Sequence, residues 1–278
     1  MTGGGPAARA AAPRLRRASG AAPPVRVLLL HGLGCRTSMW DPFVRLAGER
    51  LEVWDIELPW HGIADGRWSH QEDNAAELAR IIAGPDGVTG FDVLVAHSFS
   101  ANLLLEAVTA GLLQPVPTVL TGPFFRSAAD DFDWKTITYY LSDFHLIFAE
   151  GLRVGDGQRL DPDTRDIWAR RLRDQLGPYG WVRFFSSYLR SPFLDLAAVT
   201  APQLVLIGDA DIAARRDGAE ALAAALPSAG LELFDHCGHF PMLEQPARFA
   251  GAINAFIDSL PHRHDDRAAT DETFLELA

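Results

Sequence analysis

The hydrophobic positions of the chain alternate between short continuous apolar runs and longer stretches with helical spacing. The apolar runs cover residues 25–30, 51–58, 91–97, 118–121, 203–207 and 231–234, and the helical stretches cover 39–46, 71–83, 101–112, 218–226 and 247–260. Short apolar runs of this kind are typical of strands that are buried on both faces of a parallel sheet. The alternation therefore predicts an α/β fold with a mostly parallel sheet of about six strands and right-handed crossovers.

One long interval departs from this alternation. Residues 122–201 contain no strand pattern but have helical spacing at 133–148, 162–176 and 179–196. The interval is too long for a plain crossover and too apolar for a loop. We therefore expect a helical lid, rich in aromatic residues, over the carboxyl ends of the strands. The α/β core would then comprise residues 25–121 and 202–260.

The two ends of the chain lack both kinds of pattern. Residues 1–24 are mostly Ala, Gly, Pro and Arg without periodicity, and residues 261–278 are mostly polar. Such segments cannot bury enough apolar surface to offset the entropy of ordering. We expect a disordered tail over 1–24 and a second tail over 261–278.

Composition restricts the class of protein further. The chain has 278 residues, of which 48% are hydrophobic and 22% charged, as in globular proteins. A net charge of −11 argues against a nucleic-acid partner, which requires a basic surface. Cys35 and Cys237 are too few for a disulfide framework, and no apolar run has the length of a membrane span. We expect a cytoplasmic protein with reduced cysteines and no membrane contact.

The segment around Ser98 indicates chemistry. A predicted strand over 91–97 runs directly into Ser98, and a helical pattern begins at once. This arrangement places the serine on a sharp turn, with its hydroxyl at the carboxyl end of the sheet. Ala96 and Ser100 are small enough for strand and helix to approach each other there. The backbone N–H of Phe99 lies at the start of the helix, where the dipole favours negative charge.

Three further loops follow predicted strands. His31-Gly-Leu33-Gly follows the first strand, and its glycines allow the Leu33 N–H to turn inward as a second anion donor. Asp209 and Asp211 follow the strand at 203–207, and His239 follows the last strand. Ligand sites of parallel sheets lie along this edge. Ser98, one of the two aspartates and His239 are therefore candidates for one site.

In these features the chain resembles α/β-hydrolase-fold enzymes, in particular lidded esterases, lactonases and carbon–carbon bond hydrolases, from Val25 to Leu260. The resemblance implies that Ser98 is a nucleophile, His239 a general base and Asp211, selected over Asp209 by the family spacing, its acid partner. It also implies that Leu33 and Phe99 supply the oxyanion hole.

The chain departs from the family pattern at three places. Ala96 and Ser100 stand where glycines are usual, and Trp60 stands where the family often has glycine. The strand hairpin that usually precedes the His-Gly loop has no counterpart, because residues 1–24 do not have a strand pattern. This predicts a truncated sheet.

The functional hypothesis is a serine hydrolase that cleaves an ester, thioester or lactone with an apolar moiety through an acyl-enzyme. The substrate would be a small apolar acyl compound. We expect no metal, since His236 and His239 have no zinc-site spacing, and no nucleotide cofactor, since no dinucleotide fingerprint is present.

Two alternatives stay open. An enzyme of a biosynthetic pathway could use the same three residues for acyl transfer, cyclisation or elimination. A non-catalytic binding module could also retain them. The oligomeric state and the identity of the substrate are not indicated.

Overall fold

A computed structural model describes residues 12–61, 66–83, 90–130, 132–155 and 157–261. Its strands form one seven-stranded sheet in the order β1-β3-β2-β4-β5-β6-β7. They are β1 (Arg14–Arg17), β2 (Val25–Leu30), β3 (Leu51–Ile56), β4 (Val93–His97), β5 (Thr118–Thr121), β6 (Gln203–Gly208) and β7 (Ala229–Phe234). All pairings from β3 to β7 are parallel, so the predicted α/β fold with a mostly parallel sheet is confirmed.

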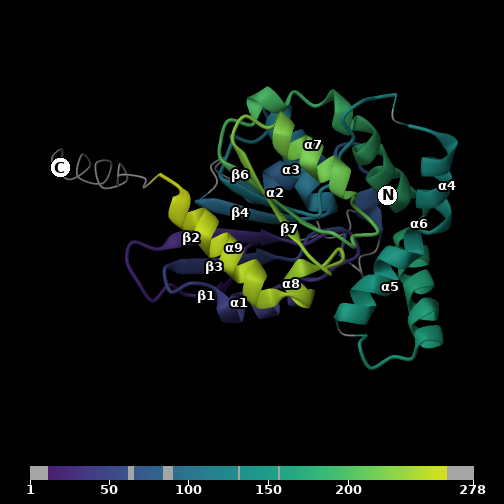
Figure 1. Ribbon diagram of the computed structural model, residues 1–278, viewed down its shortest axis with the longest axis horizontal. Helices are drawn as coiled ribbons and strands as arrows, with labels where there is room; N and C mark the ends of the chain where they lie inside the picture. Colours follow the sequence, from purple (N-terminus) through teal and green to yellow (C-terminus); the bar gives the residue numbers. More distant parts are fainter. Residues whose placement is uncertain (1–11, 62–65, 84–89, 131, 156, 262–278) are drawn as a thin grey trace, which may run out of the picture.

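Helices cover both faces of the sheet (Figure 1). The core helices are α1 (Asp41–Leu46), α2 (Asn74–Ala83), α3 (Phe99–Thr109), α7 (Arg216–Ala225), α8 (Pro241–Glu244) and α9 (Pro246–Ser259). Short 3₁₀ helices cover Thr37–Trp40, Arg67–His70, Ser191–Phe193 and Leu196–Ala198. Leu28 and Leu30 of β2 belong to one buried apolar cluster with residues of α2, α3 and α7, whereas Val27 and Leu29 belong to a second cluster with residues of α1 and α9. Alternate residues of the strand thus enter opposite cores, which is why residues 27–30 are a continuous apolar run.

The sheet has seven strands rather than the predicted six or so, and the predicted disordered tail is wrong for the described residues 12–24, because residues 14–17 form β1. This strand pairs antiparallel with β3 at the edge of the sheet. Its arginines hold it there: Arg14 and Arg16 both bind the carboxylate of Asp55, which is 1% exposed, and Arg16 also binds Asp41 at 2.6 Å. An edge strand held by ion pairs has no apolar pattern. Residues 1–11 and 262–278 of the two predicted tails lie outside the described residues.

Between β5 and β6, the described residues form three α-helices. They are α4 (Trp134–Ser142), α5 (Phe144–Val154) and α6 (Pro162–Arg190), and they lie together beyond one end of the sheet (Figure 1). Gly177, with φ +72°, and Pro178 interrupt α6 near the boundary between the two helices predicted there. On α3, Glu106 accepts hydrogen bonds from Ser187 and, at 2.6 Å, from Arg190, so α6 is fastened to the core. The segment α4–α6, which corresponds to the predicted lid, is called the lid below.

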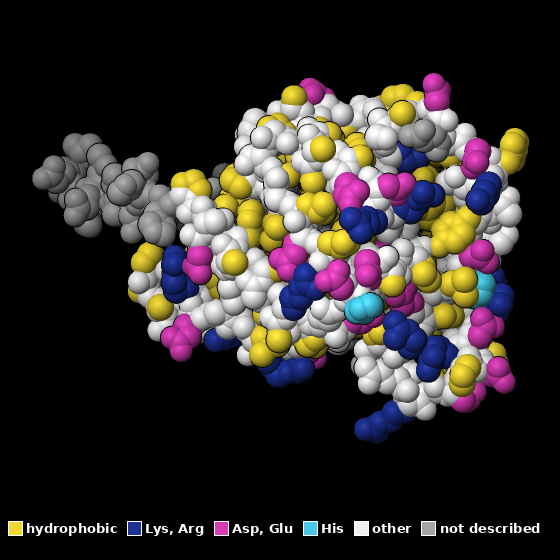
Figure 2. Space-filling view, in the orientation of Figure 1, with side chains coloured by type: hydrophobic (Ala, Val, Ile, Leu, Met, Phe, Trp, Pro, Cys, Tyr) yellow, Lys and Arg dark blue, Asp and Glu magenta, His cyan; other side chains and the backbone are white. Residues whose placement is uncertain are grey.

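Charged side chains are distributed over the surface. On the face shown in Figure 2, acidic and basic groups of the described residues are interspersed rather than segregated. Within the described part of the chain, no helix has both the length and the apolar character needed to span a bilayer.

Candidate active site

Ser98 occupies the turn between β4 and α3, and its backbone is strained. Its φ of 56° and ψ of −123° lie in a region that residues with a Cβ rarely adopt. The surroundings fix this conformation, because the Ser98 N–H donates to Thr121 at 2.8 Å and its carbonyl accepts from Ala101 at 2.9 Å. The hydroxyl does not cap the helix that follows. It is therefore free to face the loops at the ends of the neighbouring strands, as the sequence predicted.

The structure brings Ser98, His239 and Asp211 together. The Nε2 atom of His239 lies 3.0 Å from Ser98 Oγ, and its Nδ1 lies 2.8 Å from Asp211 Oδ2. A carboxylate only accepts hydrogen bonds, so Nδ1 carries the proton and Nε2 presents its lone pair to the serine. The other oxygen of Asp211 accepts from the N–H groups of Ala213 and Ala214 at 2.7 and 2.8 Å. These contacts fix the carboxylate and, through it, the ring.

Asp209 occupies a different position from Asp211. Its Oδ1 accepts a hydrogen bond from the Cys237 N–H at 3.2 Å. Hydrogen bonds from the backbone of His236 and Cys237 lower the pKa of this carboxyl. Asp209 thus holds the loop that carries His239, whereas Asp211 contacts the His239 ring itself.

Two buried histidines have opposite electrostatic surroundings. Burial disfavours the charged form of His239, but Asp211, Glu150 and Glu244 more than offset this, so the pKa of His239 is raised. At His97 burial and the neighbouring His239 set the pKa well below its ordinary value. His97 is therefore neutral, and its Nε2–H donates to the His239 carbonyl at 2.9 Å. His97 supports the His239 backbone without competing for a proton.

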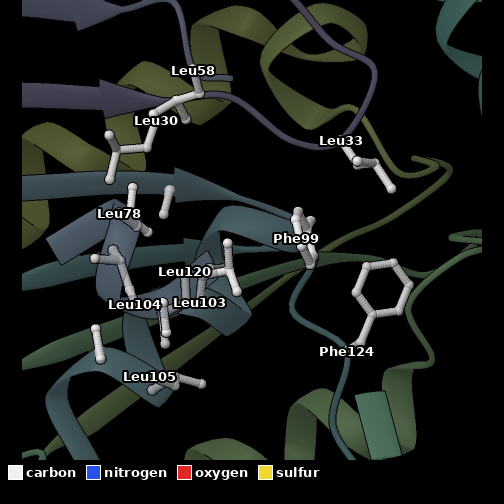
Figure 3. Packing of buried hydrophobic residues seen from close by; sticks show 14 of the residues in the cluster. Leu30, Leu33, Leu58, Leu78, Phe99, Leu103, Leu104, Leu105, Leu120 and Phe124 are labelled. Carbon is white, nitrogen blue, oxygen red and sulfur yellow. The ribbon is translucent and has the colours of Figure 1, made fainter. Parts of the chain in front are cut away.

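The loop after β2 lies directly against the serine. A Cβ on Gly32 would lie 2.6 Å from His97 Nδ1 and 3.0 Å from Ser98 Cβ, so only glycine permits this approach. Figure 3 shows Leu33 and Phe99 near each other beyond the ends of the strands. Phe99 is the first residue of α3, and its N–H therefore has no acceptor within the helix. The two predicted anion donors thus come from segments that flank Ser98.

His31 fixes this loop from beneath. Its Nε2 accepts from the Leu58 N–H at 2.9 Å and its Nδ1 donates to the Gly32 carbonyl at 2.9 Å. Burial lowers its pKa to about 4, so the ring is neutral at pH 7. These contacts account for His31 as a structural residue.

Trp60 and Ser100, which both depart from the family pattern, are hydrogen-bonded to each other. The indole N–H of Trp60 donates to Ser100 Oγ at 3.2 Å, and Ser100 Oγ in turn donates to the His31 carbonyl at 2.5 Å. Both side chains are fully buried. A serine in place of the usual glycine supplies the acceptor that a buried indole requires.

Sequence reasoning missed several residues of this site. Gly122, directly after β5, has φ +57°, and a Cβ there would lie 2.9 Å from His239 Cε1. From the lid, the hydroxyls of Tyr139 and Tyr140 donate to the carbonyls of Ile212 and Ala213, next to Asp211. Glu150, also in the lid, accepts from the His239 N–H. A glycine at a strand end was a usable sign of Gly122, but no local pattern marks the lid residues.

No metal site accompanies these residues in the described parts of the chain: no group of three or more His, Cys, Asp or Glu side chains there could hold an ion. Cys35 and Cys237 are both free thiols.

Comparison with known proteins gives the family of this chain. Residues 27–252 match the model of the alpha/beta hydrolase family, to which the chain therefore belongs. It is 25% identical, over 82% of its own length and 94% of the other, to a pimeloyl-[acyl-carrier protein] methyl ester esterase of Nitrosomonas europaea. These findings support a hydrolytic enzyme.

Solved structures agree on the fold. An esterase of Rhodococcus sp. superposes with a TM-score of 0.60 at 17% identity, covering 91% of this chain and 99% of that one. An enol-lactonase of Burkholderia xenovorans superposes with a TM-score of 0.54 at 16% identity, covering 90% and 96%.

Proposed function

We propose that this protein is a serine hydrolase that cleaves an ester, thioester or lactone with an apolar moiety through an acyl-enzyme. The observation that carries the proposal is the position of His239 between Ser98 and Asp211, with the serine on a strained turn. Strain at a non-glycine residue is retained where function requires it. The esterase relative at 25% identity supports the same class of reaction.

In the first half-reaction, His239 Nε2 accepts the Ser98 proton as Oγ attacks the substrate carbonyl carbon. The Leu33 and Phe99 N–H groups stabilise the resulting oxyanion, each by about 3 kcal/mol. The tetrahedral intermediate then collapses, His239 gives its proton to the leaving alcohol or thiol, and the acyl group stays on Ser98. Asp211 holds the tautomer of His239 and stabilises the imidazolium.

In the second half-reaction, His239 removes a proton from water, which attacks the acyl-enzyme carbonyl. Collapse of this second intermediate releases the acid and returns the proton to Ser98 Oγ. The bond between Ser98 Oγ and the acyl carbon forms in the first half-reaction and breaks in the second, so the net change is cleavage of the substrate by one water molecule, with no change of oxidation state.

Aromatic rings beside the three residues support an apolar substrate. The Phe124 ring lies 5.8 Å from the His239 ring, and Phe184 packs on Phe124 at 4.8 Å. Phe144 packs on both Phe184 and Phe148, and Phe148 covers Gly34 of the loop after β2. An acyl or alcohol group held among these rings gains about 0.8 kcal/mol for each buried methylene.

Covalent labelling tests the nucleophile. A serine-directed fluorophosphonate is expected to add to Ser98, and Ser98→Ala should abolish the label, as detected by mass spectrometry of the intact protein and its peptides. The matched control is Ser100→Ala, which removes a buried hydroxyl two residues away. Label that persists in Ser98→Ala, or that is found on Ser100, would contradict the assignment.

Isotope incorporation tests the second half-reaction within the same proposal. During turnover of an ester in ¹⁸O-water, the released acid should carry the label. Unlabelled acid would show that the carboxylate departs without an acyl-enzyme, as in elimination, and a product joined to an added alcohol would show acyl transfer.

Gly122 gives a structural test of the geometry. Gly122→Ala should lower kcat/KM by about 100-fold, because its methyl group would displace the His239 ring, and misplacement of about 1 Å has an effect of that size. Gly111→Ala is the control, since Gly111 also has a positive φ, of +70°, but open space around its Cβ. Both variants should lose thermal stability, but only Gly122→Ala should lose kcat/KM. Equal activities would contradict the role of this contact.

A further inference from the structure

Glu150 of the lid helix α5 reaches the backbone beside His239. Its Oε1 accepts a hydrogen bond from the His239 N–H at 3.1 Å. A Cβ on Gly238 would lie only 1.6 Å from the same oxygen, so the carboxylate fills the space that this glycine leaves. The Glu150 side chain is 9% exposed. The lid thus places a buried carboxylate within the loop that carries His239.

The negative charge of the Glu150 carboxylate has few polar partners. Its Oε2 is buried and has no hydrogen-bond partner among the described residues. The nearest ion-pair partner, Arg153, lies 3.9 Å from Oε1, is half exposed and also pairs with Glu244 at 3.3 Å. Burial accordingly raises the pKa of Glu150. A glutamine could accept the same hydrogen bond without burying a charge, so backbone support alone does not explain a glutamate here.

We propose that Glu150 is a positioning residue for His239: its carboxylate holds the His239 backbone and favours the positively charged imidazolium that forms during the reaction. The inference rests on the proposed function, in which His239 is the base. It assigns a role in the chemical step to a lid residue that does not touch the reacting atoms.

The other groups that contact His239 do not replace the charge and the hydrogen bond that Glu150 supplies. Asp211 pairs with the ring, His97 packs on it at 4.6 Å, and Glu244 accepts from the N–H groups on both sides of it, at Gly238 and Phe240. His97 is neutral, as argued above. Burial also raises the pKa of Cys237 to about 12, so this thiol carries no charge near pH 7.

The cavity between α5, the start of α6 and the loops after β6 and β7 adds Arg165, Asp166 and His236 to the groups near Glu150. Arg165 donates to the Leu160 carbonyl at 3.0 Å. Asp166 is paired with Arg170 at 2.7 Å. On the lid side, Tyr139 of α4 is kept protonated near pH 7, because burial and Asp211 raise its pKa. The carboxylates that act on His239 are therefore Asp211, Glu150 and Glu244.

Glu150→Gln tests the proposal, because it retains the acceptor and removes the charge. The pKa of His239, measured by NMR of its imidazole nitrogens, should fall by about one unit, the usual effect of a nearby charge. The acidic limb of the kcat/KM profile should move to lower pH by the same amount. At its plateau, kcat should fall several-fold, since the imidazolium is less stabilised.

The thermal stability of Glu150→Gln should not fall with its activity. A carboxyl with a raised pKa in the folded state disfavours folding once pH exceeds its unfolded pKa, because the unfolded chain releases the proton first. Glu150→Gln removes this penalty, so its Tm at pH 7 should equal or exceed that of the wild type. A residue with only a structural role would lose Tm together with activity.

Glu220→Gln is the control, since it removes one exposed carboxylate of α7 that pairs with Arg216. It should leave the His239 pKa, the kcat/KM profile and kcat unchanged. An unchanged His239 pKa in Glu150→Gln, or a loss of activity that follows a lower Tm, would overturn the inference.

The NMR measurement separates this inference from the proposed function. A shifted His239 pKa in a protein whose Ser98 takes no fluorophosphonate would contradict the hydrolase proposal but leave the influence of Glu150 on His239 established. Labelling at Ser98 without a shift in the His239 pKa would support the hydrolase proposal but contradict the role of Glu150.

Discussion

Ser98→Ala and His239→Ala are each expected to reduce kcat/KM for an activated ester by about 10⁴-fold or more. Ser98 Oγ is a weak nucleophile unless His239 Nε2, 3.0 Å away, accepts its proton, and without Ser98 the base has no hydroxyl proton to accept. The double variant should therefore be no slower than the worse single variant. Initial rates, measured at substrate concentrations far below KM, give the three values directly.

Ser259→Ala, which removes a hydroxyl at the end of α9, serves as the control for handling and folding. It should retain full activity, and all variants should unfold cooperatively. Losses that multiply in the double variant would contradict a single catalytic unit. A mild effect of Ser98→Ala beside a severe effect of His239→Ala would favour proton abstraction without an acyl-enzyme.

The parts of the fold that follow from local patterns could be predicted from the sequence. The central strands are buried on both faces, so residues 27–30 of β2 and 93–96 of β4 are continuous apolar runs that lead into the loops of the site. Strand β1 could not be predicted in this way. Its pairing depends on contacts between Arg14, Arg16 and Asp55, about forty residues away, and the charge pattern of an arginine-rich segment is also typical of a disordered tail.

The residues of the candidate site also fall into two groups, those that a local pattern predicts and those that it does not. Ser98, Asp211 and His239 each follow a strand, so chain order and topology placed all three at one edge of the sheet. Glu150 and Tyr140 enter the site from helices that pack back over that edge, and their partners lie 89 and 73 residues away. Such contacts depend on how the lid docks, which no local periodicity encodes. Trp60 and Ser100 show the same limit, since each departs from the family pattern and only their mutual hydrogen bond explains both.

The two aspartates after β6 allow a matched comparison. Asp211→Asn is expected to lower kcat/KM by about 10⁴-fold, because an amide facing His239 Nδ1 can donate a hydrogen bond and so stabilises the tautomer with the proton on Nε2. That tautomer presents a donor to Ser98 and cannot accept its proton. Asp209→Asn keeps an acceptor for the Cys237 N–H and should change kcat/KM only a few-fold. Steady-state kinetics and the rate of fluorophosphonate labelling should rank the two variants alike.

The pH dependence of the same variants gives a second test, with its sign fixed by the surroundings of His239. Asp211 and the two glutamates raise the pKa of His239 against the effect of burial. In Asp211→Asn the negative charge that offsets the effect of burial is removed, so the pKa of His239 falls. The residual activity should therefore reach its plateau at lower pH than in the wild type. Asp209→Asn should leave the acidic limb in place, since Asp209 contacts the backbone of the loop and not the ring. If Asp209→Asn instead shows the large loss and the shifted limb, Asp209 would be the acid partner of His239, and the loop after β6 would have to rearrange during the reaction.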